Sequence, residues 1–242
     1  MARSYSFPSN TITANRNCPP MRSPFSPLYL LLFIFAIGLL LAVVQVGAVT
    51  IAFGRLGLSQ SSAFLLLFAS LFGSAINLPL FTIPASRPPT PPADPVLRGL
   101  LRQMQQEFTG RTLIAINVGG GLIPILFSLY LLRHNDLGLT QLLLGIAGVA
   151  FISHLASRPV PGLGIGMPIL IAPVSAALLA ILLAPEQSAP LAYISGTLGV
   201  LIGADLLRLR DIGNMGLPMA AIGGAGTFDG IFLTGLVAVL LA

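Results

Sequence analysis

Long apolar runs, separated by short polar segments, follow one another from about residue 28 to the end of the chain. Several of these runs reach the ~20 residues that a helix needs to cross the hydrocarbon core of a bilayer. They predict seven membrane-spanning helices, at about residues 28–53, 61–83, 111–132, 139–156, 160–184, 189–207 and 214–241. The expected fold class is therefore all-α: a polytopic bundle of about seven transmembrane helices, some of them broken by glycine and proline.

Two segments lack the apolar pattern. Residues 1–27 are rich in Ser, Asn and Pro, and this composition predicts a disordered cytoplasmic tail before a transmembrane helical domain at 28–242. The longest loop, residues 84–110, begins with a proline-rich stretch that is expected to be extended. Its second half has apolar residues on one helical face and Arg98 and Arg102 on the other. This half predicts an amphipathic helix on the membrane surface; the alternative is a plain connector.

Composition supports the membrane assignment. The chain is 55% hydrophobic and 8% charged, whereas soluble domains carry roughly a quarter charged residues. This excludes a soluble fold and makes the lipid bilayer the expected partner. The net charge of +5 comes from twelve arginines and no lysine. We interpret it as charge on cytoplasmic loops, so no nucleic-acid partner is expected.

The arginines also predict the orientation of the spans. With the N-terminus inside, ten of the twelve arginines fall in cytoplasmic segments, and only Arg55 and Arg133 fall in outer loops. The positive-inside rule favours this arrangement, with the C-terminus outside. No cofactor or metal is expected, because the single Cys18 and two histidines offer no zinc-ligand spacing.

Two aspartates lie within predicted spans, where a charge costs roughly 2.5–3.5 kcal/mol. Asp205 is near the cytoplasmic end of the sixth span. Its structural alternative is an interfacial ion pair with Arg208, three residues later on a helix. Asp229 has no basic residue nearer than Arg210; its structural alternative is to cap a broken helix or to bond across the bundle. Asp211, next to Arg210, is expected to be solvated.

The depth of Asp229 depends on whether the last span is straight. A straight helix over residues 214–241 would place Asp229 ~22 Å below its cytoplasmic start, far from Asp205. However, "GNMGLPMAAIGGAGT" is rich in glycine and contains Pro218, and both residue types disfavour a helix interior. A broken segment, with a final helix from about Thr227, would bring Asp229 toward the level of Asp205. The spacing allows such a pair without requiring it.

Small residues followed by proline recur in "SAINLPLF", "NVGGGLIPILF", "GLGIGMPILIAP" and "GNMGLPMAAIGG". Such segments indicate either close helix packing or discontinuous helices that line a binding site. They are not interpreted as phosphate-binding loops, because no strand–turn–helix context is expected around them. The remaining polar residues in the spans are predicted to form hydrogen bonds between helices; they are Gln45, Asn77, Asn117, Ser153 and His154.

From about residue 70 onward, "GSAINLPL", "IAINVGGGLIPILFSLYLL", "SRPVPGLGIGMPILIAPVSAALLAILL" and "GGAGTFDGIFLTGLVAVLLA" resemble a family of prokaryotic multi-pass membrane proteins catalogued as a domain of unknown function. The resemblance implies a prokaryotic plasma-membrane protein, or an internal photosynthetic membrane in a phototroph. It supplies no reaction.

A weaker resemblance is to intramembrane aspartyl peptidases of the presenilin and prepilin-peptidase type. Asp205 in "GADLLRLRDIGN" is similar to their first aspartate, and "GGAGTFDG" is similar to the Gly-x-Gly-Asp motif that holds the second. In this chain Thr227 and Phe228 stand between Gly226 and Asp229. The resemblance implies that Asp205 and Asp229 are the catalytic residues.

Three hypotheses about function follow. The first is a membrane-embedded aspartyl hydrolase that acts on a membrane peptide, with Asp205 and Asp229 sharing one proton. The second is a transporter or channel in which Asp229 binds a small ion or relays protons. The third is a non-catalytic membrane scaffold.

Overall fold

The computed structural model describes residues 46–86, 110–160, 164–215, 217–224 and 230–242. The predicted tail, the start of the first span and the predicted surface helix lie outside these residues. In chain order the elements are the helical segment Val46–Arg55, α2 (Gln60–Gly73), β1 (Asn77–Pro84), β2 (Arg111–Asn117), the π-helix η1 (Val118–Leu122), α4 (Ile123–His134), α5 (Leu139–Ala156), β3 (Arg158–Val160), β4 (Gly164–Gly166), α6 (Ile171–Leu183), the 3₁₀ turn η2 (Pro185–Gln187), α7 (Ser188–Val200), the π-helix η3 (Leu201–Asp205), the 3₁₀ turn η4 (Leu206–Arg208), α8 (Leu209–Gly213), β5 (Met219–Ile222) and α9 (Gly230–Leu241).

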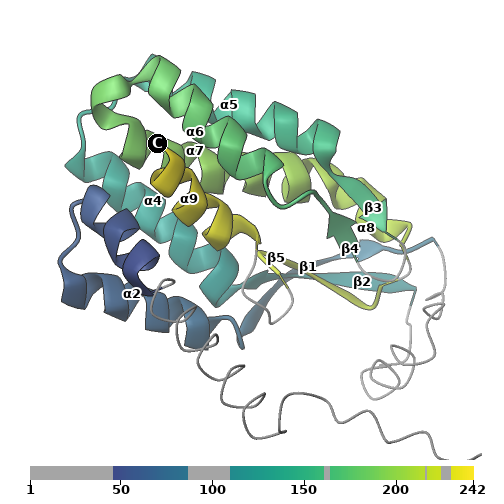
Figure 1. Cartoon of the computed structure of the whole chain (residues 1–242). Helices are drawn as coiled ribbons and strands as arrows, with labels where there is room; N and C mark the ends of the chain where they lie inside the picture. The colour runs from purple at the N-terminus through teal and green to yellow at the C-terminus, as the bar shows by residue number, and fades with distance from the viewer. Residues whose placement is uncertain (1–45, 87–109, 161–163, 216, 225–229) are drawn as a thin grey trace, which may run out of the picture. The chain divides into compact units, whose positions relative to one another are not determined.

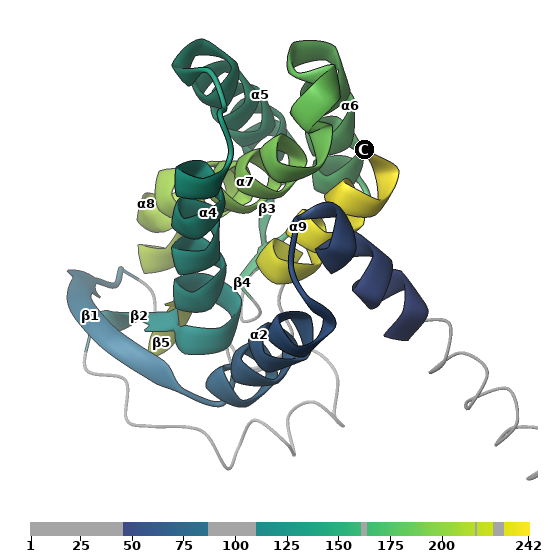
Figure 2. The same ribbon diagram turned by 90° about the vertical axis from the view of Figure 1, so that its left-hand side faces the viewer.

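Helix α7 lies at the centre of the described helices. It contacts α4, α5, α6 and α9, and most of its residues are buried. Figures 1 and 2 show these helices grouped around it. A helix that is apolar on all sides is expected in such a central position. The outer helices instead expose large apolar side chains, including Leu143 and Phe151 of α5, Leu182 of α6 and Phe72 of α2.

Two helical stretches are long and apolar enough to cross a membrane. They are α5 and the continuous run Pro185–Gly213, which joins η2, α7, η3, η4 and α8. A third possibility is the pair Val46–Arg55 and Gln60–Gly73, if these two helices, bent by 113°, are counted as one span. The predicted spans at 139–156 and 189–207 are therefore confirmed as helices of sufficient length.

The other four predicted spans that fall on described residues are not single helices. Residues 61–83 contain α2 and then β1, and residues 111–132 contain β2, η1 and α4. Residues 160–184 contain strand β4 before α6, and residues 214–241 contain β5 before α9. The all-α prediction is thus wrong in part: the described chain is mostly helical but includes strands. The length of an apolar run does not separate these cases, because an extended apolar strand and a short helix together are as long as one membrane span.

Strands β1, β2 and β5 form a mixed sheet in that order. β1 pairs with β2 antiparallel, and β2 pairs with β5 parallel. The local sequence accounts for β2, where the β-branched residues Thr112, Ile114 and Ile116 alternate with the period of a strand. Pro79 and Pro84 disfavour a helix in β1 and are tolerated in an edge strand. A second, two-stranded hairpin joins β3 and β4.

Glycines allow the chain to cross itself where the strands meet the helices. The β2 strand leads through the "VGGGL" π-helix into α4, and this π-helix packs on the end of α2. A methyl group added to Gly119 would lie 1.8 Å from the Ser70 carbonyl oxygen, and one on Gly223 would lie 2.5 Å from the Gly121 nitrogen. Only glycine permits these backbones to approach so closely.

Candidate functional site

Asp205 is the last residue of the π-helix η3, which continues α7 from Leu201 onward. π-helical turns are rare and are frequent at functional sites. Here the wider turn lies against α5, where a methyl group on Gly203 would come within 2.1 Å of the Ala150 carbonyl oxygen. Close contact between the two backbones thus determines where the half-buried Asp205 carboxylate lies.

The carboxylate of Asp205 contacts the end of β5. Its Oδ2 atom accepts a hydrogen bond from the Gly223 N–H at 3.2 Å. Gly223 directly follows β5 and has a φ of 79°, which a residue with a side chain rarely adopts. This hydrogen bond joins Asp205 to Gly223, eighteen residues later in the chain, at the start of the segment that leads to α9.

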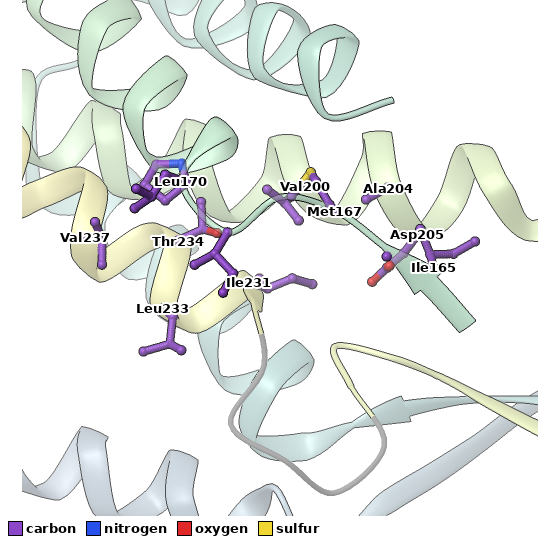
Figure 3. Close-up of a pocket in the computed structure, with 13 residues that line it drawn as sticks. Ile165, Met167, Leu170, Val200, Ala204, Asp205, Ile231, Leu233, Thr234 and Val237 are labelled. Atoms are coloured by element: carbon purple, nitrogen blue, oxygen red, sulfur yellow. The ribbon is translucent and has the colours of Figure 1, made fainter. Parts of the chain in front are cut away.

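A cavity of about 400 Å³ lies beside Asp205 (Figure 3). Its walls come from β4 and the residues that follow it, from α7 and η3, and from α9. The lining residues are Ile165, Gly166, Met167, Ile169, Leu170, Pro173, Val200, Ala204, Asp205, Ile231, Leu233, Thr234 and Val237. Among these side chains, only Asp205 and Thr234 carry hydrogen-bonding oxygen atoms. The site is thus an apolar cavity with a carboxylate and one hydroxyl in its wall.

Asp229 lies outside the described residues, so its distance to Asp205 stays a prediction. The described residues on either side of it are informative. Gly223, six residues earlier, bonds the Asp205 carboxylate, and Ile231, two residues later, lines the same cavity. The predicted break in the last span is confirmed, because β5 ends at Ile222 and α9 begins at Gly230. The depth that a straight helix implies for Asp229 therefore does not apply.

Arg208 forms an ion pair with Asp211, in which the Nη1 and Oδ2 atoms lie 3.0 Å apart. Its remaining donors bond the end of α5: the carbonyl oxygens of His154 and Ser157 and the Ser157 hydroxyl. A cation at a helix C-terminus also interacts favourably with the helix dipole. Arg208 therefore joins α8 to α5. The Asp211 side chain is 38% exposed, in line with the expectation that it is solvated, and it also pairs with Arg208.

Replacing Arg208 with alanine is expected to lower the free energy of unfolding by about 2 kcal/mol, because charged hydrogen bonds to two carbonyls at the end of α5 are lost. The melting temperature of the purified protein in detergent measures this effect. The matched control is Arg210→Ala, because Arg210 is exposed. Equal melting temperatures for the two variants would contradict the anchoring role of Arg208.

The other polar residues predicted to bond between helices are partly accounted for. The Asn117 amide donates to the Ser74 carbonyl and to Asn77 Oδ1, and its own oxygen accepts from the Gly120 N–H. His154 contacts the Gly203 carbonyl through Nδ1. The Ser153 hydroxyl, by contrast, is buried without a hydrogen-bond partner in the described part of the chain. Gln45 lies outside it.

The glycine-rich segments need one correction. Strand–turn–helix contexts do exist, since β2 leads through η1 into α4. The glycines of η1 nevertheless pack against α2 and against Gly223, and the Gly120 N–H donates its hydrogen bond to the Asn117 side-chain oxygen. Close packing is thus confirmed at η1. In the segment "GLGIGMPILIAP", the described residues from Ile165 to Pro173 supply one wall of the cavity, and a binding role for them stays a prediction. Within the described ranges, no three His, Cys, Asp or Glu residues are grouped to hold a metal ion.

Sequence reasoning selected Asp205 because a carboxylate in an apolar run is costly, but it missed Thr234. The available signal was that Thr234 is the only polar side chain in α9. The glycines and proline of the β4 segment stand out in the sequence, but the packing that puts this segment in the same cavity wall as Asp205 does not.

Comparison with known protein families gives one match for this chain. A family model described as "Protein of unknown function (DUF1614)" matches residues 71–241, which include every element from β1 to α9. No curated protein and no solved structure matches the chain.

Proposed function

We propose that this chain, which belongs to the DUF1614 family of proteins of unknown function, is a membrane-embedded aspartyl hydrolase that cleaves a peptide bond, with Asp205 and Asp229 as its acid–base pair. One observation carries the proposal. The segment that contains Asp229 is connected to the Asp205 site at both ends, through the Gly223–Asp205 hydrogen bond and through Ile231 in the cavity wall. A short connection with both ends at one site favours two carboxylates close enough to share a proton.

Location in a membrane is supported by α5 and Pro185–Gly213, which have the length and composition of membrane spans, and by the apolar side chains that the outer helices expose. Exposed apolar patches of this extent are rare on soluble proteins. Seven crossings are not required: short helices and strands at membrane depth are tolerated where protein buries them or water reaches them. We propose that this membrane is the prokaryotic plasma membrane.

The orientation follows from the arginines. Arg158 lies two residues after the end of α5, and Arg208 bonds the same end of that helix. Arg210 lies in α8, immediately beyond. Under the positive-inside rule this end faces the cytoplasm. Asp205 lies three residues from Arg208, so cytoplasmic water would have a short path to its carboxylate.

The proposed chemistry needs one carboxylate ionised and one protonated. Two carboxylates that share a site cannot both be ionised, so one of them holds the proton. The ionised group takes a proton from water, whose oxygen bonds to the carbonyl carbon, while the protonated group donates its proton to the carbonyl oxygen. The tetrahedral intermediate then loses its C–N bond. The carboxyl group that took the water proton donates it to the leaving nitrogen, and the other carboxylate takes a proton from a hydroxyl of the intermediate, which leaves an amine and a new carboxyl group.

The test uses the full-length protein in lipid bicelles, a pool of synthetic single-span peptides, and water enriched in ¹⁸O. Mass spectrometry is expected to find peptide fragments with one ¹⁸O atom in the new carboxyl group. Asp205→Asn and Asp229→Asn are each expected to reduce the cleavage rate at least ~100-fold, as is typical when an acid–base group is lost. Asp211→Asn is the matched control, since this carboxylate pairs with Arg208 and does not line the cavity.

Cleavage by a folded Asp205→Asn variant at the wild-type rate would contradict the proposal. If the wild-type protein cleaves no peptide, proton uptake by proteoliposomes separates the two alternatives. Uptake that is lost in Asp229→Asn would favour the transporter, and absence of both activities would favour the scaffold.

A further inference from the structure

Thr234 is a buried hydroxyl in the wall of the cavity. It lies in α9, is 3% exposed, and is surrounded by apolar lining residues (Figure 3). Among the side chains that line the cavity, those of Thr234 and Asp205 carry the oxygen atoms. A ligand in the cavity can therefore accept a hydrogen bond from the Thr234 hydroxyl.

The packing of α9 on α7 explains why the hydroxyl, and not the methyl group, is available. A methyl group placed on Gly196 would lie 3.5 Å from Thr234 Cγ2, so the threonine methyl group packs on α7 at this glycine. β-branched side chains have few allowed χ1 rotamers. With Cγ2 held against α7, the Oγ1 atom is directed elsewhere, and Figure 3 shows it on the side of the cavity.

The chemistry of the cavity indicates which ligand it suits. Its walls are aliphatic, and the rim residue Ile169 is 82% exposed, so apolar groups can enter. A hydroxyl in such a place pairs well with an uncharged acceptor such as an amide carbonyl. A peptide with apolar side chains carries both features.

We propose that Thr234 is a substrate-positioning residue, whose hydroxyl donates a hydrogen bond to a backbone carbonyl of an apolar peptide next to the bond that is cleaved. This inference rests on the proposed hydrolase function and names a residue for substrate binding. Thr234 takes no part in proton transfer; it sets the register of the peptide relative to Asp205.

The test compares Thr234→Val, which keeps the shape and removes the hydroxyl, with Thr234→Ser, which keeps the hydroxyl. Thr197→Val is the matched control, because Thr197 is a fully buried threonine of α7 that does not line the cavity. The probe is an apolar hexapeptide in which a hydroxyethylene group replaces the central Leu–Leu amide. Its Kd is measured for each variant in detergent, alongside the melting temperature of the protein.

Thr234→Val is expected to weaken probe binding about tenfold, the effect of one lost hydrogen bond, while Thr234→Ser and Thr197→Val stay within about threefold of wild type. For a cleaved peptide, Thr234→Val should raise KM and leave kcat nearly unchanged, as expected when uniform binding is lost.

Failure of this inference is distinguishable from failure of the hydrolase proposal. If no peptide is cleaved, but only Thr234→Val weakens the probe, the binding role stands and the hydrolase proposal falls. If Asp205→Asn abolishes cleavage while Thr234→Val keeps the wild-type Kd and KM, the inference is overturned. Absence of probe binding by the wild-type protein also overturns it.

Discussion

Replacing Gly119 with alanine is expected to prevent the protein from folding. The added methyl group would lie 1.8 Å from the Ser70 carbonyl oxygen, 2.4 Å from the Ser74 nitrogen and 2.9 Å from the Gly73 carbonyl carbon. All three atoms belong to the backbone at the end of α2, so no side-chain rotation relieves the contact. We expect a loss of about 4 kcal/mol or more, at the extreme of single substitutions. The measurement is the yield of monodisperse protein by size-exclusion chromatography in detergent.

Alanine substitutions at two other glycines, Gly73 and Gly54, are expected to have smaller effects on stability than Gly119→Ala. A methyl group on Gly73 would come within 3.1 Å of the Gly119 nitrogen, which requires only a small shift, whereas one on Gly54 would meet nothing within 4 Å. Gly54→Ala lies in a helix and should stabilise the protein by about 0.5–1 kcal/mol. The melting temperatures should therefore decrease from Gly54→Ala to Gly73→Ala, with Gly119→Ala not folding. A folded Gly119→Ala variant would mean that η1 does not cross α2 at this distance.

The apolar runs predicted the helical parts of the fold but not the strands. Residues 139–156 were predicted as one span and form α5 with the same bounds. In 111–132, by contrast, the alternation of Thr112, Ile114 and Ile116 carried the period of a strand, but the length of the whole run dominated the prediction. The pairing of β2 with β5 brings together segments about a hundred residues apart. A long-range pairing of this kind has no signal in the local sequence.

From the sequence, only the charged residues of the candidate site could be predicted, because a carboxylate is conspicuous within an apolar run. Asp205 met that criterion, and so did Asp229. The surroundings of Asp205 depend on tertiary structure: the N–H that bonds it belongs to Gly223, and the cavity beside it has walls from β4 and α9. Arg208 shows the same limit. Helical spacing allows its ion pair with Asp211, three positions away. Its hydrogen bonds to the end of α5 join residues more than fifty positions apart, and the local sequence has no signal for them.

Replacing Gly203 with alanine is the second substitution with a large expected effect, and it links packing to the site. The methyl group would lie 2.1 Å from the Ala150 carbonyl oxygen and 2.8 Å from its carbonyl carbon. The π-helix η3 would have to move away from α5, and Asp205, two residues later, would move with it. We expect a loss of about 3 kcal/mol or more in stability. In any protein that folds, the hydrogen bond from Gly223 to Asp205 should also be lost.

The matched control lies on the same pair of helices. A methyl group on Gly145 of α5 would come within 3.3 Å of the Ser195 Cβ atom of α7, so a small adjustment accommodates it. Gly145→Ala should therefore melt within a few degrees of wild type and keep its activity, because Gly145 lies away from the cavity. If Gly203→Ala behaved like Gly145→Ala, η3 would not be held against α5 by its backbone. Conversely, a Gly203→Ala variant that folds but binds the hydroxyethylene peptide poorly would show that this contact positions Asp205.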